Sequence, residues 1–514
     1  MRRKNIVLFA VVAIKFALQI FAIDPVYELH RDEFLHLDLG KHLAWGYLSV
    51  PPVTGVISFV IRLLGNSVFW VKFFPALFGA LTMVIVWKTV EELKGGWFAL
   101  LLASSGMLFS VFVRINTLYQ PNSLDFLMWT ILLYVLLKYM NTENNKWLYT
   151  AGVTFAIGFL NKYNIAFLLA GLFPAILLSP QRKVFTNKHF YFAAAISFLL
   201  VLPNLIWQYR NDFPVVHHMR TLAATQLGNV DRWGFLLDQA LFFTGSIFVL
   251  IAAMVAFFAY KPFRKYRIFF FTFLFTLVLF VYLKAKSYYS IGLYPVFLAI
   301  GAVYLEDLLK TGWLRYFRIP LILLPVLIYG PLLRIALPFM SPEKIMQKKD
   351  RFDQFGLTRW EDGQLHDIPQ DYADMQGWKE LAAIVDSAFT LVDDKTRTLI
   401  HCDNYGQAGA INFYAKQKYS EAYTMNADYI NWYPLDKFEI VNVILVKERF
   451  DDDSERKRET AFFEHVSRVG EIKNKYAREN GTSVYLLEKA KVSVNKVLQE
   501  EIDKHLVERR AALK

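Results

Sequence analysis

The stretch from Tyr27 to Pro52 concentrates the side chains that could do chemistry. It reads YELHRDEFLHLDLGKHLAWGYLSVPP, follows the first apolar run directly and contains the adjacent acids Asp32 and Glu33. A carboxylate at a membrane surface can act as a general base, taking the proton of a hydroxyl while its oxygen attacks. On a helix the two acids would point about 100° apart, so only one is expected to face a given substrate. Alternatively, both acids simply cap and charge the N-terminus of a helix running to Ala44, where negative charge stabilises the helix.

Three histidines in the same stretch raise the alternative of a metal site. His30, His36 and His42 lie close to Asp38 in the sequence, and imidazole and carboxylate groups can bind zinc. Their spacing matches no familiar ligand motif, so we expect no metal ligands and no required cofactor, and a divalent metal stays an alternative. The single cysteine, Cys402, excludes an intrachain disulfide and a thiolate cluster.

A second set of candidates lies near the expected outer ends of apolar runs. Lys162, Arg114 and Arg220 occur where an ammonium or guanidinium group could bind a lipid-linked phosphate. The alternative for each is snorkelling toward lipid headgroups. His218 follows His217 in the same long loop as Arg220, and two neighbouring histidines cannot both face one metal on regular structure.

Further candidates lie inside the apolar runs. Asp125 is near the start of the fourth run, and a carboxylate near a membrane is costly and often functional. In a first helical turn it can also simply favour the helix dipole. Tyr288 and Tyr289 precede a Tyr-Pro pair, and by physical criteria alone these residues indicate an aromatic belt and a helix kink.

The composition indicates that membrane helices must position these residues. Hydrophobic residues make up 55% and aromatic residues 17% of the 514 residues, more apolar than is usual for a soluble protein of this length. The net charge of +12 fits basic cytoplasmic loops better than a nucleic-acid surface. The N-terminal MRRK and the run after it predict a retained first membrane helix rather than a cleaved signal peptide.

We count eleven apolar runs that could span a membrane, which requires about 17–25 residues each. They are Asn5–Ile23, Ser67–Val90, Trp97–Val113, Asn122–Met140, Trp147–Leu160, Tyr163–Leu178, Phe190–Tyr209, Gly234–Tyr260, Ile268–Leu283, Tyr288–Leu305 and Ile319–Pro338. The run Val53–Leu64 is too short to span and predicts an interfacial amphipathic helix with Arg62 on its polar side. With the N-terminus in the cytoplasm, the short basic loops all lie on the cytoplasmic side, and the tail lies outside.

The composition becomes polar after Pro338. We predict a transmembrane domain over residues 1–340, with the candidate catalytic first outer loop at 24–66, and a soluble α/β domain on the outer, periplasmic face over 341–514. Helices are expected at Trp378–Leu391, Ala408–Lys416, Ser454–Ser467 and Val492–Leu513, and strands at Thr398–His401, Val441–Val446 and Ser483–Leu487.

Six short motifs follow one another in a familiar order. They are Asp32-Glu33 with Gly46-Tyr47 and Pro51-Pro52; Gln120-Pro121 with Asp125 and Trp129; Asn161-Lys162-Tyr163; Leu202–Gln208 followed by Pro214; Tyr288-Tyr289 before Tyr294-Pro295; and Asp403–Ala410. In this order they resemble the bacterial GT-C glycosyltransferases of family 39, the protein-mannosyltransferase-like group. The resemblance covers nearly the whole membrane part and touches the tail.

The resemblance implies a mainly α, polytopic fold: a GT-C core of roughly 11 transmembrane helices, juxtamembrane helices in the first outer loop, and an outer soluble domain. It implies transfer of a sugar from a polyprenyl-phosphate donor to a lipid, glycan or protein acceptor at a bacterial inner membrane. Asp32 of the Asp32-Glu33 pair would be the base. The predicted substrate-binding residues are Lys162, Tyr163, Arg220, His218, Asp125, Tyr288 and Tyr289.

One position departs from related enzymes. Aminoarabinose transferases that modify lipid A resemble this group but carry Glu-Lys just before the first-loop proline, where this chain has Val50-Pro51 before Pro52. The departure argues against that specific activity, and against a metal carboxylate or a phosphate-binding lysine there. The alternative function is a transporter or flippase of a lipid-linked or anionic substrate. Transporters usually carry ionisable groups at mid-membrane and often show inverted repeats, whereas here the charged candidates gather at one face.

Overall fold

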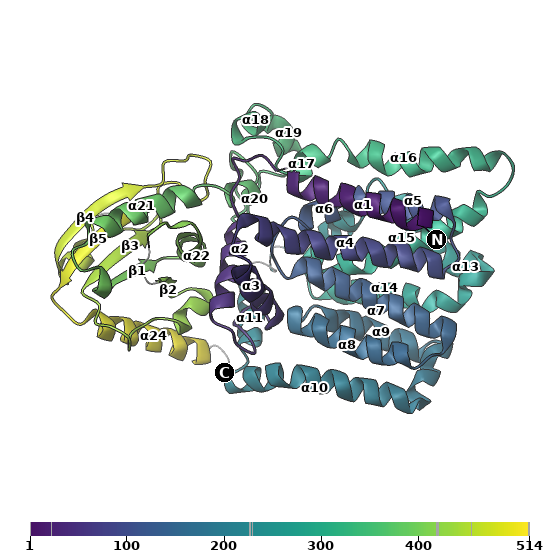
Figure 1. Ribbon diagram of the computed structural model, residues 1–514, viewed down its shortest axis with the longest axis horizontal. Helices are drawn as coiled ribbons and strands as arrows, with labels where there is room; N and C mark the ends of the chain where they lie inside the picture. Colours follow the sequence, from purple (N-terminus) through teal and green to yellow (C-terminus); the bar gives the residue numbers. More distant parts are fainter. Residues whose placement is uncertain are drawn as a thin grey trace.

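The computed structural model describes residues 2–21, 23–225, 228, 230–417, 421–453 and 455–511. A bundle of helices forms one end of the molecule and an α/β unit forms the other (Figure 1). Among the described residues, six helices are long and apolar enough to cross a membrane, or up to seven if one sharply bent pair counts as a span. The chain is therefore a mainly helical, multi-pass membrane protein.

Each of the eleven predicted apolar runs contains a helix. The helices are α1 (Arg2–Phe21), α4 (Val68–Glu92), α5 (Trp97–Leu108), α7 (Asn122–Thr142), α8 (Lys146–Asn161), α9 (Ile165–Leu177), α10 (Lys188–Arg210), α13 (Ile247–Ala259), α14 (Arg267–Tyr282), α15 (Tyr294–Leu308) and α16 (Arg318–Tyr329). Several are shorter than a membrane is thick, so eleven complete spans stay a prediction. The expected break after the fifth run is present, because α8 ends at Asn161 and α9 begins at Ile165.

The eighth predicted run is not one continuous helix. It divides into α12 (Arg232–Leu241) and α13, with a turn between them. In that turn a Cβ on Gly245 would lie 2.8 Å from the Cα of Pro325, so the backbone passes directly against α16. This close approach is a tertiary constraint that hydropathy does not reveal.

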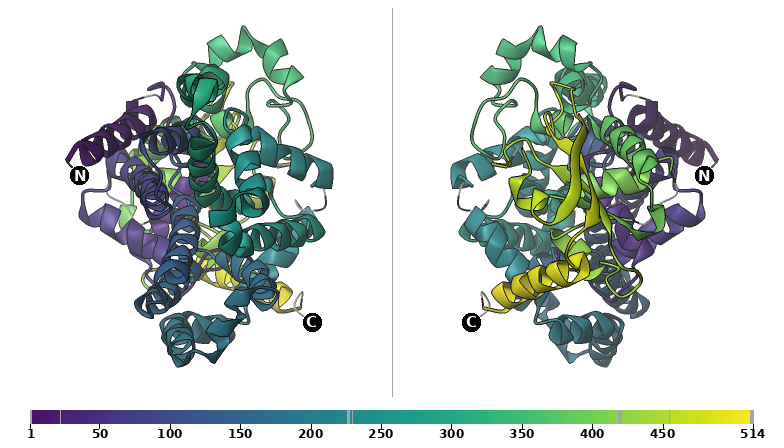
Figure 2. Two further views of the ribbon diagram at one scale, coloured as in Figure 1. Left: turned by 90° about the vertical axis from the view of Figure 1, so that its right-hand side faces the viewer. Right: turned by 90° about the vertical axis from the view of Figure 1, so that its left-hand side faces the viewer.

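Two helices at the edge of the bundle leave apolar surface uncovered. In α10 only 22% of the spanning window is buried, and in the segment Gly312–Ala336, which includes α16, only 11% is. Both lie at the periphery of the bundle (Figures 1 and 2). Uncovered apolar helix faces of this kind suit contact with lipid tails.

The predicted first outer loop forms short helices between the bundle and the α/β unit (Figure 1). They are α2 (Arg31–Asp38), the 3-10 turn η1 (Leu39–Lys41) and α3 (Val53–Leu63). The helix expected to run to Ala44 ends earlier, because α2 stops at Asp38 and only the 3-10 turn continues to Lys41. A Cβ on Gly40 would lie 2.6 Å from the backbone of Ser58, so the chain turns where α3 crosses it.

The α/β unit contains a five-stranded sheet with the order β2-β1-β3-β5-β4. The strands are β1 (Thr398–Cys402), β2 (Ala422–Thr424), β3 (Asn442–Lys447), β4 (Phe463–Glu471) and β5 (Ser483–Ala490). β1 pairs in parallel with β2 and β3, and β5 is antiparallel to β3 and β4. Helices α21 (Trp378–Leu391) and α22 (Tyr405–Tyr414) pack on one face, and α24 (Val494–Ala511) packs on the other.

The predicted helix at Ser454–Ser467 is wrong. Within that range the described residues form only the short helix α23 (Lys457–Thr460) and the start of β4. β4 is an edge strand with mostly exposed or half-buried residues, so it lacks the apolar alternation that marks a strand. Residues 512–513 of the predicted last helix lie outside the described residues.

One hydrophobic core crosses the junction between the two ends of the molecule. Phe34 and Leu37 of α2 belong to the same buried cluster as Trp378 of α21, Ile411 of α22 and Ile444 of β3. α2 is therefore packed into the α/β unit as well as against α3. The predicted domain boundary at residue 340 stays a prediction.

Candidate active site

The N-terminus of α2 fixes the two candidate acids in different surroundings. The Nδ1 atom of His30 accepts the Asp32 N–H at 3.2 Å, and a Glu33 carboxylate oxygen accepts the His30 N–H at 2.7 Å. This reciprocal arrangement is a capping box. The capping role expected for both acids therefore belongs to Glu33.

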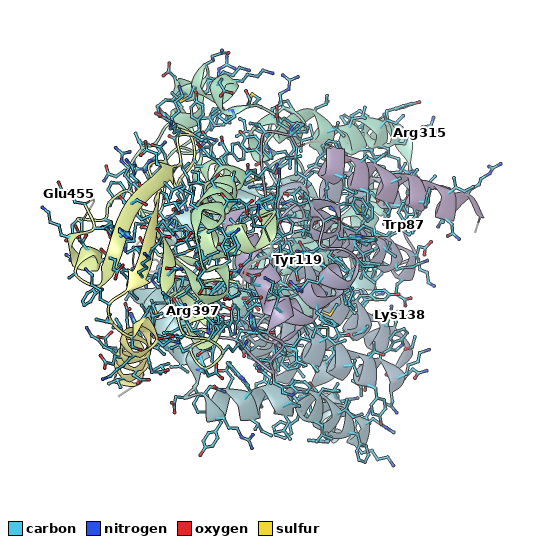
Figure 3. All side chains as sticks on the ribbon, turned by 60° about the vertical axis from the view of Figure 1, so that its left-hand side comes forward. Trp87, Tyr119, Lys138, Arg315, Arg397 and Glu455 are labelled. Carbon is cyan, nitrogen blue, oxygen red and sulfur yellow. The ribbon has the colours of Figure 1, made fainter. Side chains whose placement is uncertain are left out.

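The Glu33 carboxylate is fully buried and held on several sides. The ammonium group of Lys72, on α4, lies 2.7 Å from both of its oxygens, and the Tyr119 N–H donates to it at 2.7 Å. Tyr119 lies at the junction between the bundle and the α/β unit (Figure 3). Glu33 thus ties α2 to the bundle, and both of its oxygens already have strong donors.

The Asp32 carboxylate is half-buried and accepts hydrogen bonds from neutral groups. The Tyr405 hydroxyl of α22 donates to Oδ1 at 2.8 Å, and the Gln120 amide donates to Oδ2 at 3.1 Å. Burial raises the pKa of Asp32, but His30 and the Tyr405 hydrogen bond are among the groups that outweigh it, so the pKa lies below its usual value. Asp32 is therefore ionised at neutral pH and can accept a proton.

A line of hydrogen bonds joins Asp32 to the predicted phosphate-binding lysine. The Gln120 amide oxygen accepts from Asn122 Nδ2 at 2.8 Å, and the Asn122 amide oxygen accepts from Lys162 Nζ at 2.7 Å. Asn122 begins α7, and Lys162 directly follows α8. Asp32, Gln120, Asn122 and Lys162 are here called the outer polar network.

Aromatic rings and a second carboxylate surround Lys162. Its ammonium group lies 4.4 Å from the ring centre of Tyr289 and 5.1 Å from that of Tyr288. Burial lowers the pKa of Lys162 to about 8, while Asp125 opposes the shift. Asp125 accepts from Asn164 Nδ2 at 2.8 Å, and that amide also donates to the Tyr289 carbonyl at 3.0 Å. These predicted residues therefore share one neighbourhood.

The remaining predicted residues lie on other elements. The Tyr163 hydroxyl donates to Asn204 at 3.1 Å and accepts from Gln208 at 2.8 Å, which connects the α8–α9 break to α10. His218 and the exposed Arg220 are on α11 (Pro214–Thr225), at the same end of the bundle as α2 (Figure 1). Burial lowers the pKa of His218.

Two further observations bear on the sequence-based candidates. Arg114 forms an ion pair with Asp371 at 2.9 Å, so its guanidinium already has a carboxylate partner. Among the residues that the structure describes, no group of three or more His, Cys, Asp and Glu side chains is arranged to hold a metal ion.

Sequence reasoning did not assign roles to Gln120, Asn122 or Tyr405. Gln120 and Tyr405 lie within motifs that carried the family resemblance, which was the available signal. Asn122 directly follows the Gln120-Pro121 motif. No periodicity or spacing indicated that these uncharged side chains would contact the base or the lysine.

Known proteins resemble this chain in sequence and in fold. A family model described as dolichyl-phosphate-mannose-protein mannosyltransferase matches residues 49–207. The structure of ArnT from Cupriavidus metallidurans bound to undecaprenyl phosphate superposes with a TM-score of 0.62 at 12% identity, covering 95% of this chain and 98% of that one. The chain has the GT-C fold.

Two further relatives extend the comparison. The apo structure of the same ArnT gives a TM-score of 0.62 at 11% identity, over 96% of this chain and 99% of that one. A lipid A galacturonosyltransferase from Rhizobium johnstonii is 26% identical over 206 residues, which is 37% of this chain. That match spans 41% of the relative's own length. The predicted resemblance to GT-C glycosyltransferases is confirmed.

Proposed function

We propose that this chain is an integral-membrane glycosyltransferase that moves a sugar from a polyprenyl-phosphate donor to an acceptor hydroxyl, with Asp32 as general base. The observation that carries the proposal is the outer polar network. It joins an ionised carboxylate to a half-buried ammonium group at the junction of the bundle and the α/β unit. The GT-C fold and the names of the similar proteins support the same reaction class.

The proposed reaction is a single displacement at the anomeric carbon of the donor sugar. Asp32 takes the proton of the acceptor hydroxyl as its oxygen bonds to that carbon. The bond from the anomeric carbon to the phosphate oxygen breaks, and its electron pair leaves with the polyprenyl phosphate. A carboxylate has about four lone-pair sites, so Asp32 can accept from a substrate hydroxyl beside Tyr405 and Gln120.

Lys162 is proposed to bind the lipid phosphate and stabilise the charge that builds up on it as the bond breaks. Its ammonium group has one hydrogen bond to a neutral amide oxygen and two aromatic neighbours. An ammonium group has three donors, so donors remain for phosphate oxygens. Asp125, Tyr288 and Tyr289 are proposed to hold Lys162 in place.

The other predicted site residues take different proposed roles. Glu33 was predicted as catalytic together with Asp32, but its contacts with Lys72 and Tyr119 favour a positioning role for α2. Tyr163 is proposed to shape the donor site through the α8–α9 break. His218 and Arg220 on α11 stay candidates for contacts with the donor.

We also propose that the α/β unit faces the periplasm and that the N-terminus is cytoplasmic. Helix α1 begins at the end of the bundle remote from the sheet (Figure 1). Lys138 and Arg315, which belong to predicted cytoplasmic loops, lie toward that same end (Figure 3). This arrangement follows the enrichment of basic residues in cytoplasmic loops and suits a bacterial inner membrane.

The test is reconstitution of the purified protein in liposomes that contain polyprenyl-phosphate sugars. Formation of a glycosidic product by the wild type, and its loss in Asp32→Asn, would support the proposal. Movement of labelled donor across the bilayer without any product would favour a flippase instead. An Asp32→Asn protein that transfers sugar at the wild-type rate would show that Asp32 is not the base.

A further inference from the structure

A polar cleft in the α/β unit adjoins α2 at Arg31. Its volume is 530 Å³, and α2 contributes to it only through this arginine. Three loop segments supply the rest of the lining: residues 360–368, residues 448–450 after β3, and residues 475–482 between β4 and β5. We call it the Arg31 cleft. Asp32, the proposed base, is the next residue along α2.

Arg31 is held in place without a carboxylate partner. Its guanidinium carbon lies 4.5 Å from the ring centre of Tyr405. A Cβ on Gly406 would lie 2.7 Å from the Cγ of Arg31, so only a glycine allows this close packing on α22. Among the described residues Arg31 has no ion pair, and its buried Nε has no hydrogen-bond partner. A buried guanidinium donor without a hydrogen bond lowers the stability of the protein unless a ligand accepts from it.

Two of the four acids in the cleft wall accept hydrogen bonds from neutral groups of the protein. Glu479 accepts from Gln407 Nε2 at 2.7 Å, from Thr482 at 3.0 Å and from Asn404 Nδ2 at 3.2 Å. Glu448 accepts from the same Asn404 amide at 2.7 Å. Neither acid forms an ion pair with Arg31. Burial lowers the pKa of Arg31, but Tyr405 and nearby acids that include Glu479 outweigh burial and raise it, so the guanidinium group stays charged. The lining has four acids and four Lys or Arg side chains, and the buried side-chain donor in it that lacks a hydrogen bond is Arg31 Nε.

The rim of the cleft adds two more cations and several aromatic rings. Arg449 and Lys475 belong to the lining and, among the described residues, have no carboxylate partner. Phe450 is 89% exposed, and the rings of Trp360 and His366 stack at 3.7 Å. Exposed rings beside a few fixed polar groups are typical of small-molecule sites. A sugar can pack its apolar face against such a ring, and its hydroxyls can form hydrogen bonds with the polar wall.

We propose that the Arg31 cleft is the acceptor site and that it binds an anionic saccharide, with Arg31 contacting its phosphate or carboxylate group. A guanidinium group suits both anions because its donors match two oxygens at once. Tyr405 connects this site to the chemistry, because its ring packs on Arg31 and its hydroxyl donates to Asp32. The inference rests on the proposed glycosyltransferase function and adds the acceptor class to it.

Binding of mannose 6-phosphate to the full-length protein in detergent, measured by calorimetry, tests the inference. Neutral mannose and inorganic phosphate are the comparison ligands. We expect mannose 6-phosphate to bind at least about tenfold more tightly than either, because charge–charge hydrogen bonds and ring contacts act together. Arg31→Gln and Arg449→Gln should each weaken binding about fivefold or more.

A matched control is Lys457→Gln, since the side chain of Lys457 is 79% exposed and is not part of the cleft lining. It should leave the affinity unchanged. Arg449 is exposed, so Arg449→Gln keeps the test valid even where Arg31→Gln fails to fold. Any of three results would overturn the inference. They are an equal affinity for inorganic phosphate or for mannose, no binding of mannose 6-phosphate, and a loss of affinity in the control equal to that in the cleft variants.

The same samples separate this inference from the proposed function. Sugar transfer that depends on Asp32, without mannose 6-phosphate binding, would count against the cleft alone. The opposite result is a protein that binds mannose 6-phosphate through Arg31 but neither binds polyprenyl phosphate nor transfers sugar. That result would count against the proposed reaction. It would leave an anionic-saccharide site.

Discussion

Asp32 and Glu33 are neighbours on α2, yet they face two different regions of the molecule. Glu33 faces the bundle, where the ammonium group of Lys72 neutralises it. Asp32 faces the junction with α22, where only the neutral groups of Gln120 and Tyr405 donate to its oxygens. A carboxylate that is paired with a buried cation has little tendency to accept a proton. One that is held by neutral donors keeps its charge available to a substrate, so partners rather than residue type separate the two roles.

Asp32→Asn should give the largest effect on activity. Loss of a general base reduces rates by about 10²- to 10⁴-fold, and the amide preserves the shape of the side chain. Transfer from a radiolabelled polyprenyl-phosphate sugar measures the loss, and thermal unfolding in detergent should stay close to the wild type. A large drop in stability would instead place Asp32 with Glu33 as a structural acid.

Glu33→Gln should act mainly on stability, because it leaves the Lys72 ammonium group buried without its counter-charge. Removing one member of a buried ion pair costs about 3–5 kcal/mol. The measurement is the free energy of unfolding in detergent. The double variant Glu33→Gln/Lys72→Met is the matched control and should recover part of the loss. A variant that unfolds like the wild type but is inactive would make Glu33 a catalytic residue rather than a positioning one.

Lys162→Gln should reduce transfer by about 10²-fold if the ammonium group stabilises the leaving phosphate. The pKa of about 8 implies that the charge is present below that pH and is lost as the pH rises through it. Wild-type activity should therefore fall above about pH 8. Lys162→Arg, which stays charged, should keep activity to higher pH, and a pH–rate profile that is identical in both proteins would remove Lys162 from the mechanism.

Gly406→Ala tests the α22 side of α2. The added methyl group would press on the Cγ of Arg31, and overpacking costs about 1–3 kcal/mol. We expect a matching fall in the free energy of unfolding and weaker acceptor binding, with donor binding retained. Gly228→Ala is a control for the added methyl group, because the nearest atom to a Cβ there is the Ala223 carbonyl oxygen at 3.8 Å and Gly228 is outside the cleft lining.

Tyr405→Phe should have the smallest effect. It removes one hydrogen bond, worth about 1 kcal/mol or roughly fivefold in rate, from the Asp32 carboxylate. Because that bond lowers the pKa of Asp32, its loss should raise the pKa. The acid limb of the pH–rate profile should then move to higher pH. No movement of that limb would indicate that the group titrating there is not Asp32.

The sequence was most informative where a pattern is local. Continuous apolar runs identified the helices of the bundle, and α21 begins and ends at the residues expected, Trp378 and Leu391. The edge strand β4 was missed because its exposed polar residues hide the alternation of a strand. The turn at Gly245 was missed because its cause is the packing of a distant helix.

The division of labour between the two acids could not be predicted from the residues alone. Glu33 meets its partner Lys72 39 residues later, in a helix expected only to span the membrane. Asp32 meets Tyr405 373 residues later, in the α/β unit. The family resemblance favoured Asp32, but contacts at such separations are set by tertiary packing and leave no periodic signal in the chain.

The contact between Asp32 and Tyr405 also has a consequence for biosynthesis. Asp32, the proposed base, is made near the start of translation, whereas its partner helix α22 is made only after the whole bundle has emerged from the ribosome. Until α22 folds against α2, neither the hydrogen bond to Asp32 nor the packing of Arg31 exists. A half-made chain would thus lack these contacts at α2, and the proposed site is complete only after α22 has folded against it.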